Sequence, residues 1–165
     1  MKIGILYGST TGNTANIAEE IAKALGVEKA DMLDVANAST DAASAYDALI
    51  LGSSTWGVGE LQDDWLNFLD SLAKVNLAGK KVALFGCGDS SSFPDSFCDA
   101  LRIIYDALAS TGCTFVGAFE PSGYDVTDSQ VCKDGKFVGL AIDDSEGSSA
   151  QRVSDWVAQL KSELA

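Results

Sequence analysis

Seven residues near the start of the sequence have the composition of a phosphate-binding loop. The stretch Gly8-Ser9-Thr10-Thr11-Gly12-Asn13-Thr14 follows an apolar run at 2–7 and precedes an amphipathic segment at 15–25 with helical spacing. A turn between a strand and a helix start presents free backbone N–H groups and the positive end of the helix dipole. The loop adds four hydroxyl groups and one amide. The alternative is an ordinary turn, because serine, threonine, asparagine and glycine are also common at turns and helix caps.

This loop differs from the two common nucleotide-binding patterns. Asn13 stands where the Walker pattern has lysine, so the loop lacks the lysine and Mg²⁺ clamp that holds a triphosphate. The loop is also not G-x-G-x-x-G, which disfavours the pyrophosphate of a dinucleotide. The residues therefore favour a single monoester phosphate that is held by neutral donors.

Strands and helices are expected to alternate along the chain. Apolar runs predict strands at 2–7, 47–54, 82–88 and 114–119, and strand-like residues return at 137–142. A weaker pattern at 29–35 predicts a second strand at an edge of the sheet. Apolar residues at helical spacing predict helices at 15–25, 61–73, 95–110 and 151–164, with a short helix near 41–45. This alternation predicts an α/β fold, a doubly wound parallel sheet with helices on both faces.

Two further loops with unusual residues follow the expected strands at 47–54 and 82–88. The first places Trp56 among glycines, and the second holds Gly86-Cys87-Gly88-Asp89 and then Phe93. In an open parallel sheet, the carboxyl ends of the strands flank the crevice where ligands bind. A phosphate site, two aromatic side chains and free backbone N–H groups suit a flat heterocycle that carries one phosphate. Trp56 and Phe93 are expected to stack on it, although Phe93 could instead anchor its own loop.

Other aromatic and acidic residues have simpler interpretations. Trp65 and Trp156 lie on the apolar faces of expected helices, which predicts that they pack in the core. A group of carboxylates is expected on a solvated face, where it would also guide a basic partner. Its members are Asp63, Asp64, Asp89, Asp95 and Asp99.

Length and charge restrict the classes of function. The 165 residues are predicted to form a single domain, 1–165, with a sizeable hydrophobic core. The 24 acidic and 11 basic residues give a formal net charge of −13, which disfavours nucleic acid and anionic membranes and favours basic protein partners. No apolar run approaches the length that spans a membrane.

Histidine and cysteine usage restricts the chemistry further. The chain has no histidine, and its four cysteines, Cys87, Cys98, Cys113 and Cys132, are widely spaced. Histidine-based triads and Cys/His zinc sites are therefore excluded. Disulfides would be expected in a secreted chain, but no charged-then-apolar signal region opens the sequence. We therefore expect reduced thiols and a cytoplasmic location.

These features together resemble the flavodoxin family over essentially the whole chain. The motifs that carry the resemblance are Gly8-Ser9-Thr10-Thr11-Gly12-Asn13-Thr14, Thr55-Trp56-Gly57-Val58-Gly59-Glu60-Leu61-Gln62-Asp63-Asp64-Trp65, Gly86-Cys87-Gly88-Asp89 and Gly135-Lys136-Phe137-Val138-Gly139-Leu140-Ala141. The interrupted fifth strand resembles that of the long-chain class, with an insertion near 120–136. The resemblance implies a five-stranded sheet in the order 2-1-3-4-5.

The resemblance also implies a binding site for flavin mononucleotide (FMN). The phosphate is assigned to Ser9, Thr10, Thr11, Gly12, Asn13 and Thr14. One wall of the flavin site is assigned to Ser54, Thr55, Trp56, Gly57, Val58 and Gly59. Cys87, Gly88 and Asp89 are expected to offer backbone groups to the pyrimidine end of the ring. Phe93 stands at the position of an outer stacking residue that is often tyrosine in the family, and the resemblance places Ser96 and Asp99 near positions that can touch the flavin loop.

The resemblance implies an electron carrier without catalytic residues or metal ligands. Its non-covalent FMN would exchange single electrons with other proteins. The implied partners are basic redox proteins, such as a flavodoxin/ferredoxin reductase, and low-potential acceptor enzymes, and the chain is expected to be a monomer.

Two other functions on similar folds are less well supported. One is an FMN-dependent quinone or nitro-compound reductase, which is disfavoured because an aromatic residue on each side of the ring leaves no open face for hydride delivery. The other is a regulatory receiver domain. Tyr7-Gly8 and Ser53-Ser54 stand where that domain needs an acidic pocket and a phospho-acceptor aspartate.

Overall fold

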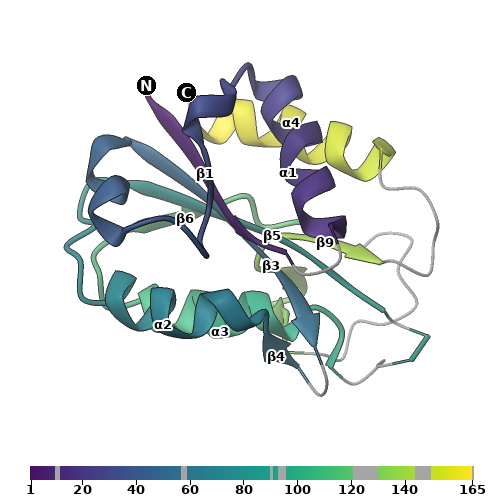
Figure 1. Ribbon diagram of the computed structural model, residues 1–165. Helices are drawn as coiled ribbons and strands as arrows, with labels where there is room; N and C mark the ends of the chain where they lie inside the picture. The colour runs from purple at the N-terminus through teal and green to yellow at the C-terminus, as the bar shows by residue number, and fades with distance from the viewer. Residues whose placement is uncertain are drawn as a thin grey trace.

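A central sheet lies between two layers of helices (Figure 1). The computed structural model describes residues 1–9, 12–56, 59–89, 91–92, 96–120, 130–143 and 150–164, and of Trp56 the backbone alone. One face of the sheet is covered by α1 (Asn13–Leu25) and α4 (Ala150–Leu164). The other face is covered by α2 (Asp63–Leu72) and α3 (Asp99–Leu108). The predicted α/β fold with helices on both faces is confirmed.

The parallel sheet has the strand order β2-β1-β3-β5-β6. Its strands are β1 (Ile3–Gly8), β2 (Met32–Asp34), β3 (Ala48–Trp56), β5 (Lys81–Gly88) and β6 (Thr114–Val116). When only these five parallel strands are numbered along the chain, β5 becomes the fourth and β6 the fifth, and the order is the predicted 2-1-3-4-5. The register aligns Ile5 with Ile50 and Ile50 with Ala83, so the middles of β1, β3 and β5 lie side by side.

The hydrophobic core lies along both faces of the central strands. Ile5, Leu6, Leu49, Ile50, Leu51 and Leu84 are fully buried. Trp65 of α2 and Trp156 of α4 are also fully buried, which confirms the prediction from their helix faces. Their indole N–H groups donate to the backbone oxygens of Gly52 and Gly117, at 2.7 and 2.8 Å. Each tryptophan therefore joins one helical layer to the sheet.

The fifth strand position is shared by two segments. β6 lies beside the first half of β5, with Val116 opposite Ala83. β9 (Leu140–Asp143) lies beside the second half, with Leu140 opposite Phe85. Between them, β7 (Cys132–Lys133) and β8 (Lys136–Phe137) form a separate antiparallel hairpin. The insertion expected near 120–136 therefore interrupts the sheet at its edge, and its residues 121–129 lie outside the described part of the chain.

The boundaries of three expected segments are wrong for local reasons. The expected loop at 55–60 is a hairpin, because β3 continues to Trp56 and pairs antiparallel with β4 (Glu60–Leu61). The helix expected at 61–73 begins at Asp63, because the Gln62 side chain caps it by accepting the N–H of Asp64 at 3.0 Å. The strand expected at 137–142 is divided between β8 and β9.

Other expected segments are shorter or tighter than their patterns indicate. The helix expected at 95–110 is regular only over α3, from Asp99. The strand expected at 29–35 begins with a 3₁₀ turn, Lys29–Asp31, in which the backbone oxygen of Lys29 accepts the N–H of Met32, and β2 starts only at Met32. The short helix expected near 41–45 is a 3₁₀ helix, Thr40–Ala45. All four cysteines are free thiols, and no helix in the described part of the chain is long and apolar enough to cross a membrane.

Candidate functional site

Three loops with predicted site residues follow neighbouring strands at one end of the sheet. In the parallel ladders, Gly8 at the end of β1 lies beside Ser53 of β3, and Ser54 lies beside Cys87 of β5. The chain therefore leaves these strands at one edge, the position where open α/β sheets bind ligands. The structure thus brings together the three groups that the sequence separated, around Ser9, Thr55 and Gly88.

The start of α1 is prepared for an anion. Gly12 stands at its N-cap with φ 97°, and its N–H donates to Ser9 Oγ at 3.1 Å. No side chain caps this helix and its first turn, which begins with Asn13 and Thr14, holds no acidic residue. By contrast, α2 carries Asp63 and Asp64 in its first turn. The free N–H groups of α1 therefore remain for a ligand. Thr10 and Thr11 lie outside the described residues.

The side chain of Thr14 points into the fold. Thr14 and Cys87 are each 1% exposed, and the Thr14 hydroxyl group donates to Cys87 Sγ at 3.8 Å. The Cys87 side chain thus faces α1, which leaves only its backbone to face a ligand beyond the strand end. This contact joins the start of α1 to the end of β5, a link across 73 residues that no local pattern could predict.

Hydrogen bonds hold the end of β3 and the turn that follows it. Ser53 is fully buried, and its Oγ accepts the N–H of Gln62 at 3.2 Å. Thr55 Oγ1 accepts the N–H of Ala100 in α3 at 3.3 Å. Gly59, with φ 84°, has the left-handed backbone that glycine adopts without strain. Of the other predicted residues, Gly57 and Val58 lie outside the described residues, as does the side chain of Trp56.

The loop after β5 folds around the Asp89 carboxylate. Asp89 Oδ1 accepts the Ser91 hydroxyl at 2.6 Å, the Ser91 N–H at 3.0 Å and the Ser92 N–H at 3.2 Å. The Ser91 side chain contributes most to holding the pKa of Asp89 below its usual value, followed by the bonds from Ser92. The carboxylate is thus occupied within its own loop, while Gly88 is buried and packs against Phe97 and Cys98. Phe93 lies outside the described residues.

Asp99 contradicts the expectation that it lies on a solvated face. It is 8% exposed, and its Oδ1 accepts the N–H of Val131 at 3.2 Å. Burial raises the pKa of Asp99, and the N–H groups of Val131 and Gln130 and the charge of Arg102 offset this only in part. The charge pattern missed this residue because its partner lies 32 residues further along the chain.

The raised pKa of Asp99 has a consequence for stability. The folded pKa lies above the unfolded value of 3.8, so the favourable contribution is complete below 3.8 and is lost as pH rises through the folded pKa. Asp99→Asn is therefore expected to be more stable than the wild type near pH 7, with a difference that shrinks as pH falls. Urea unfolding of both proteins across this pH range measures the difference. A difference that widens on acidification contradicts the assignment.

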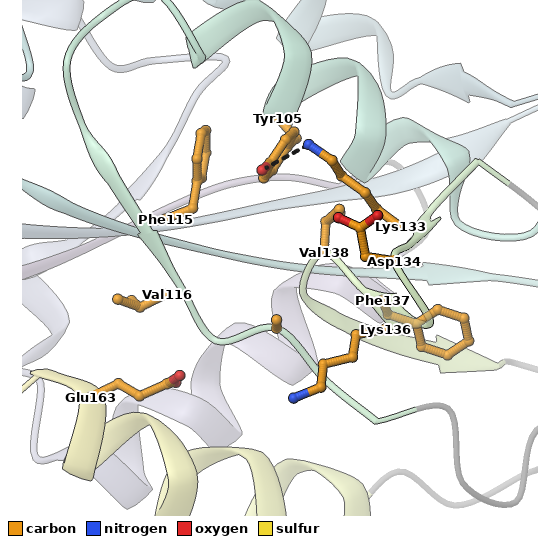
Figure 2. Close-up of a pocket in the computed structure, with 10 residues that line it drawn as sticks. Tyr105, Phe115, Val116, Lys133, Asp134, Lys136, Phe137, Val138 and Glu163 are labelled. Atoms are coloured by element: carbon orange, nitrogen blue, oxygen red, sulfur yellow. Dashed lines mark hydrogen bonds between the residues drawn. The ribbon is translucent and has the colours of Figure 1, made fainter.

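A separate hollow lies beside the edge strand β6 (Figure 2). Its volume is about 300 Å³, and it is lined by residues of α3, β6, the β7–β8 hairpin and the end of α4. On one side Lys133 Nζ lies 3.3 Å from the Tyr105 hydroxyl group, and the Tyr105 ring stacks on Phe115 with centroids 4.2 Å apart. None of the predicted site residues lines this hollow. It is therefore distinct from the strand-end site.

Comparisons with known proteins agree with this geometry. The family model described as flavodoxin matches residues 5–156. A flavodoxin of Synechococcus elongatus is 46% identical over 99% of this chain and 98% of its own length. Flavodoxin 1 of Escherichia coli is 46% identical over 98% of this chain and 93% of its own. The crystal structure of Fusobacterium nucleatum flavodoxin bound to flavin mononucleotide superposes with a TM-score of 0.89, at 34% identity and 99% coverage of both chains. The chain belongs to the flavodoxin family.

Proposed function

We propose that this protein carries single electrons between redox proteins by means of non-covalently bound FMN. Its relatives are electron-transfer proteins rather than reductases. The observation that carries the proposal is the start of α1, which has no side-chain cap and no acidic residue in its first turn and lies at the same edge of the sheet as the ends of β3 and β5. This arrangement fits a planar ring system with one terminal phosphate.

The residues present fit FMN in chemical type. Ser9, Gly12, Asn13 and the backbone of Thr14, with Thr10 and Thr11, would hold the phosphate through neutral donors. The segments 54–59 and 87–89, with Phe93, would enclose the ring. The flavin, when bound, supplies the electron-transfer chemistry. The protein's own part is to bind and orient it and to exclude water from it.

FMN is expected to bind much more tightly than riboflavin. Riboflavin lacks the phosphate, and the loss of two or more hydrogen bonds to that charged group should weaken binding by roughly a hundredfold or more. FAD should also bind weakly, because it places a second phosphate and adenosine where the loop closes. Fluorescence titration of the apoprotein with each flavin measures the three affinities. The protein should also purify yellow with one FMN per chain, and equal affinity for all three flavins contradicts the proposal.

The partners proposed for this carrier are basic redox proteins, such as a flavodoxin/ferredoxin reductase, and low-potential acceptor enzymes. The net charge is −13, and exposed carboxylates of Glu60, Asp63 and Asp64 lie directly after the β3 loop. These charges would steer a basic surface toward the strand-end site. We also propose that the chain acts as a cytoplasmic monomer and folds as one domain over 1–165.

Electron exchange with a basic reductase is expected to slow as salt is added. Ions shorten the range of charge interactions to about 8 Å at physiological ionic strength, so steering between the two surfaces weakens. Stopped-flow measurements from dilute buffer to about 0.5 M salt, at which the Debye length is roughly 4 Å, test this expectation. A rate that rises and then falls still agrees with charge pairing, since strong pairing traps unproductive orientations. A rate that does not depend on ionic strength contradicts it.

A further inference from the structure

A carboxylate buried at the start of α3 has partners on two sides. Asp99 is the first residue of the helix and is 8% exposed, whereas carboxylates in proteins are rarely buried without a partner. The side chain of Arg102, one turn further on, forms its ion pair with Asp106 at 2.9 Å. Asp99 Oδ1 instead accepts the backbone N–H of Val131 at 3.2 Å.

The first side is the insertion that interrupts the fifth strand. Val131 is fully buried, and its backbone oxygen accepts the N–H of Val138 at 2.9 Å. Arg102 Nη1 donates to the backbone oxygen of Gln130 at 3.1 Å, which gives the same segment a second attachment to α3. The segment 130–131 is therefore the point at which the insertion is fastened to the start of this helix.

The second side is the loop after β3, which the proposed function assigns to FMN. A Cβ atom placed on Gly59 would lie 3.0 Å from Asp99 Cβ and 3.3 Å from Asp99 Oδ2, so this turn packs directly on the Asp99 side chain. The next residue of α3, Ala100, donates its N–H to Thr55 Oγ1. The start of α3 thus contacts the end of β3 at Thr55 and the following turn at Gly59.

We propose that Asp99 is a positioning residue for the FMN site: its carboxylate holds the insertion segment 130–131 and the turn at Gly59 against the start of α3. The inference rests on the proposed function, because it concerns the loop that would enclose the ring. It gives the insertion a role in the site, because the segment 130–131 and the turn at Gly59 both contact the start of α3. Without the Val131 bond, the Asp99 side chain is free to rotate away from Gly59, and the turn loses the surface on which it packs.

Two substitutions at position 99 separate the hydrogen-bond acceptor from the rest of the side chain. Asp99→Ala removes the acceptor, and Asp99→Asn retains a side-chain oxygen of nearly the same size and position. Asp99→Ala should raise the dissociation constant for FMN by about tenfold, while Asp99→Asn should stay within about threefold of the wild type. Asp70→Ala, which removes an exposed carboxylate from α2, is the matched control and should change nothing.

Hydrogen–deuterium exchange of the full-length apoprotein tests the same link without FMN. In Asp99→Ala, amide exchange should accelerate both at 130–131 and at 59–62, and in Asp99→Asn at neither. Acceleration confined to 130–131, with an unchanged FMN affinity, overturns the proposal, because Asp99 then only anchors the insertion. Equal loss of affinity in both variants overturns it as well, because the acceptor would not be what matters. If the wild type takes up no FMN, the proposed function fails, and the exchange result alone decides the role of Asp99.

Discussion

Gly139→Ala is expected to destabilise the folded protein by about 3 kcal/mol, the upper end of the usual cost of overpacking. A Cβ atom at Gly139 would lie 2.1 Å from the backbone oxygen of Leu84 and 2.7 Å from its carbonyl carbon. β5 cannot move aside, because it is paired with β3 on one side and with β6 and β9 on the other. The insertion returns to the sheet at this point, so β9 would be displaced. Urea unfolding of the apoprotein measures the loss.

Gly135→Ala is the control for this prediction. Gly135 lies four residues earlier, in the insertion, with φ 82°, and no atom of the described residues stands within 4 Å of the Cβ atom that alanine would add. Its cost should be limited to the unfavourable positive φ, about 1 kcal/mol. Similar losses for the two variants would show that backbone conformation, and not the contact with Leu84, limits position 139.

Trp65→Ala is expected to cost about 3–5 kcal/mol of stability and to weaken FMN binding as well. The ring is fully buried and its N–H donates to the oxygen of Gly52. A Cβ atom on Gly8 would lie 2.7 Å from Trp65 Cδ1, so the indole supports the strand end from which the phosphate loop leaves. Removing it leaves a cavity under that loop and a carbonyl group without its donor.

Leu66→Ala is the matched control, because Leu66 is the next residue of α2 and is 53% exposed. Its effect on stability should stay within about 0.5 kcal/mol. Urea unfolding and fluorescence titration with FMN, applied to both variants, measure the two effects. If Trp65→Ala loses stability but keeps the FMN affinity of the wild type, the indole supports the core and not the loop.

The periodicity of apolar residues was enough to predict the layers of this fold. The continuous run at 47–54 indicated a strand buried on both faces, and Leu49, Ile50 and Leu51 are fully buried. The spacing of Trp65 and Trp156 placed both on buried helix faces. Periodicity failed where only two residues pair, as in β4, because so short a strand has no period. It also failed at the start of α2, since glutamine is not a typical N-cap.

The candidate site was predictable only as far as chain order determines it. The residues after β1, β3 and β5 were expected to meet because parallel strands end at one edge, and the described ones do. The contacts that fix these loops join residues far apart in the sequence, Thr14 with Cys87 and Asp99 with Val131. Such pairs depend on tertiary packing and leave no local pattern. Asp99 accordingly had the sequence signature of an exposed acid.

The shared fifth strand position constrains how this protein could evolve. On β5, Ala83 pairs with Val116 and Phe85 pairs with Leu140. Leu84 alone lies between these two positions of β5, so the chain leaves the sheet and returns to it at almost the same place. Lengthening or shortening the intervening chain costs little loop-closure entropy, and the sheet need not change. A lineage that lost the insertion would, however, leave the Asp99 carboxylate without the N–H of Val131. Deletion of that segment and replacement of Asp99 should therefore occur together in descendants.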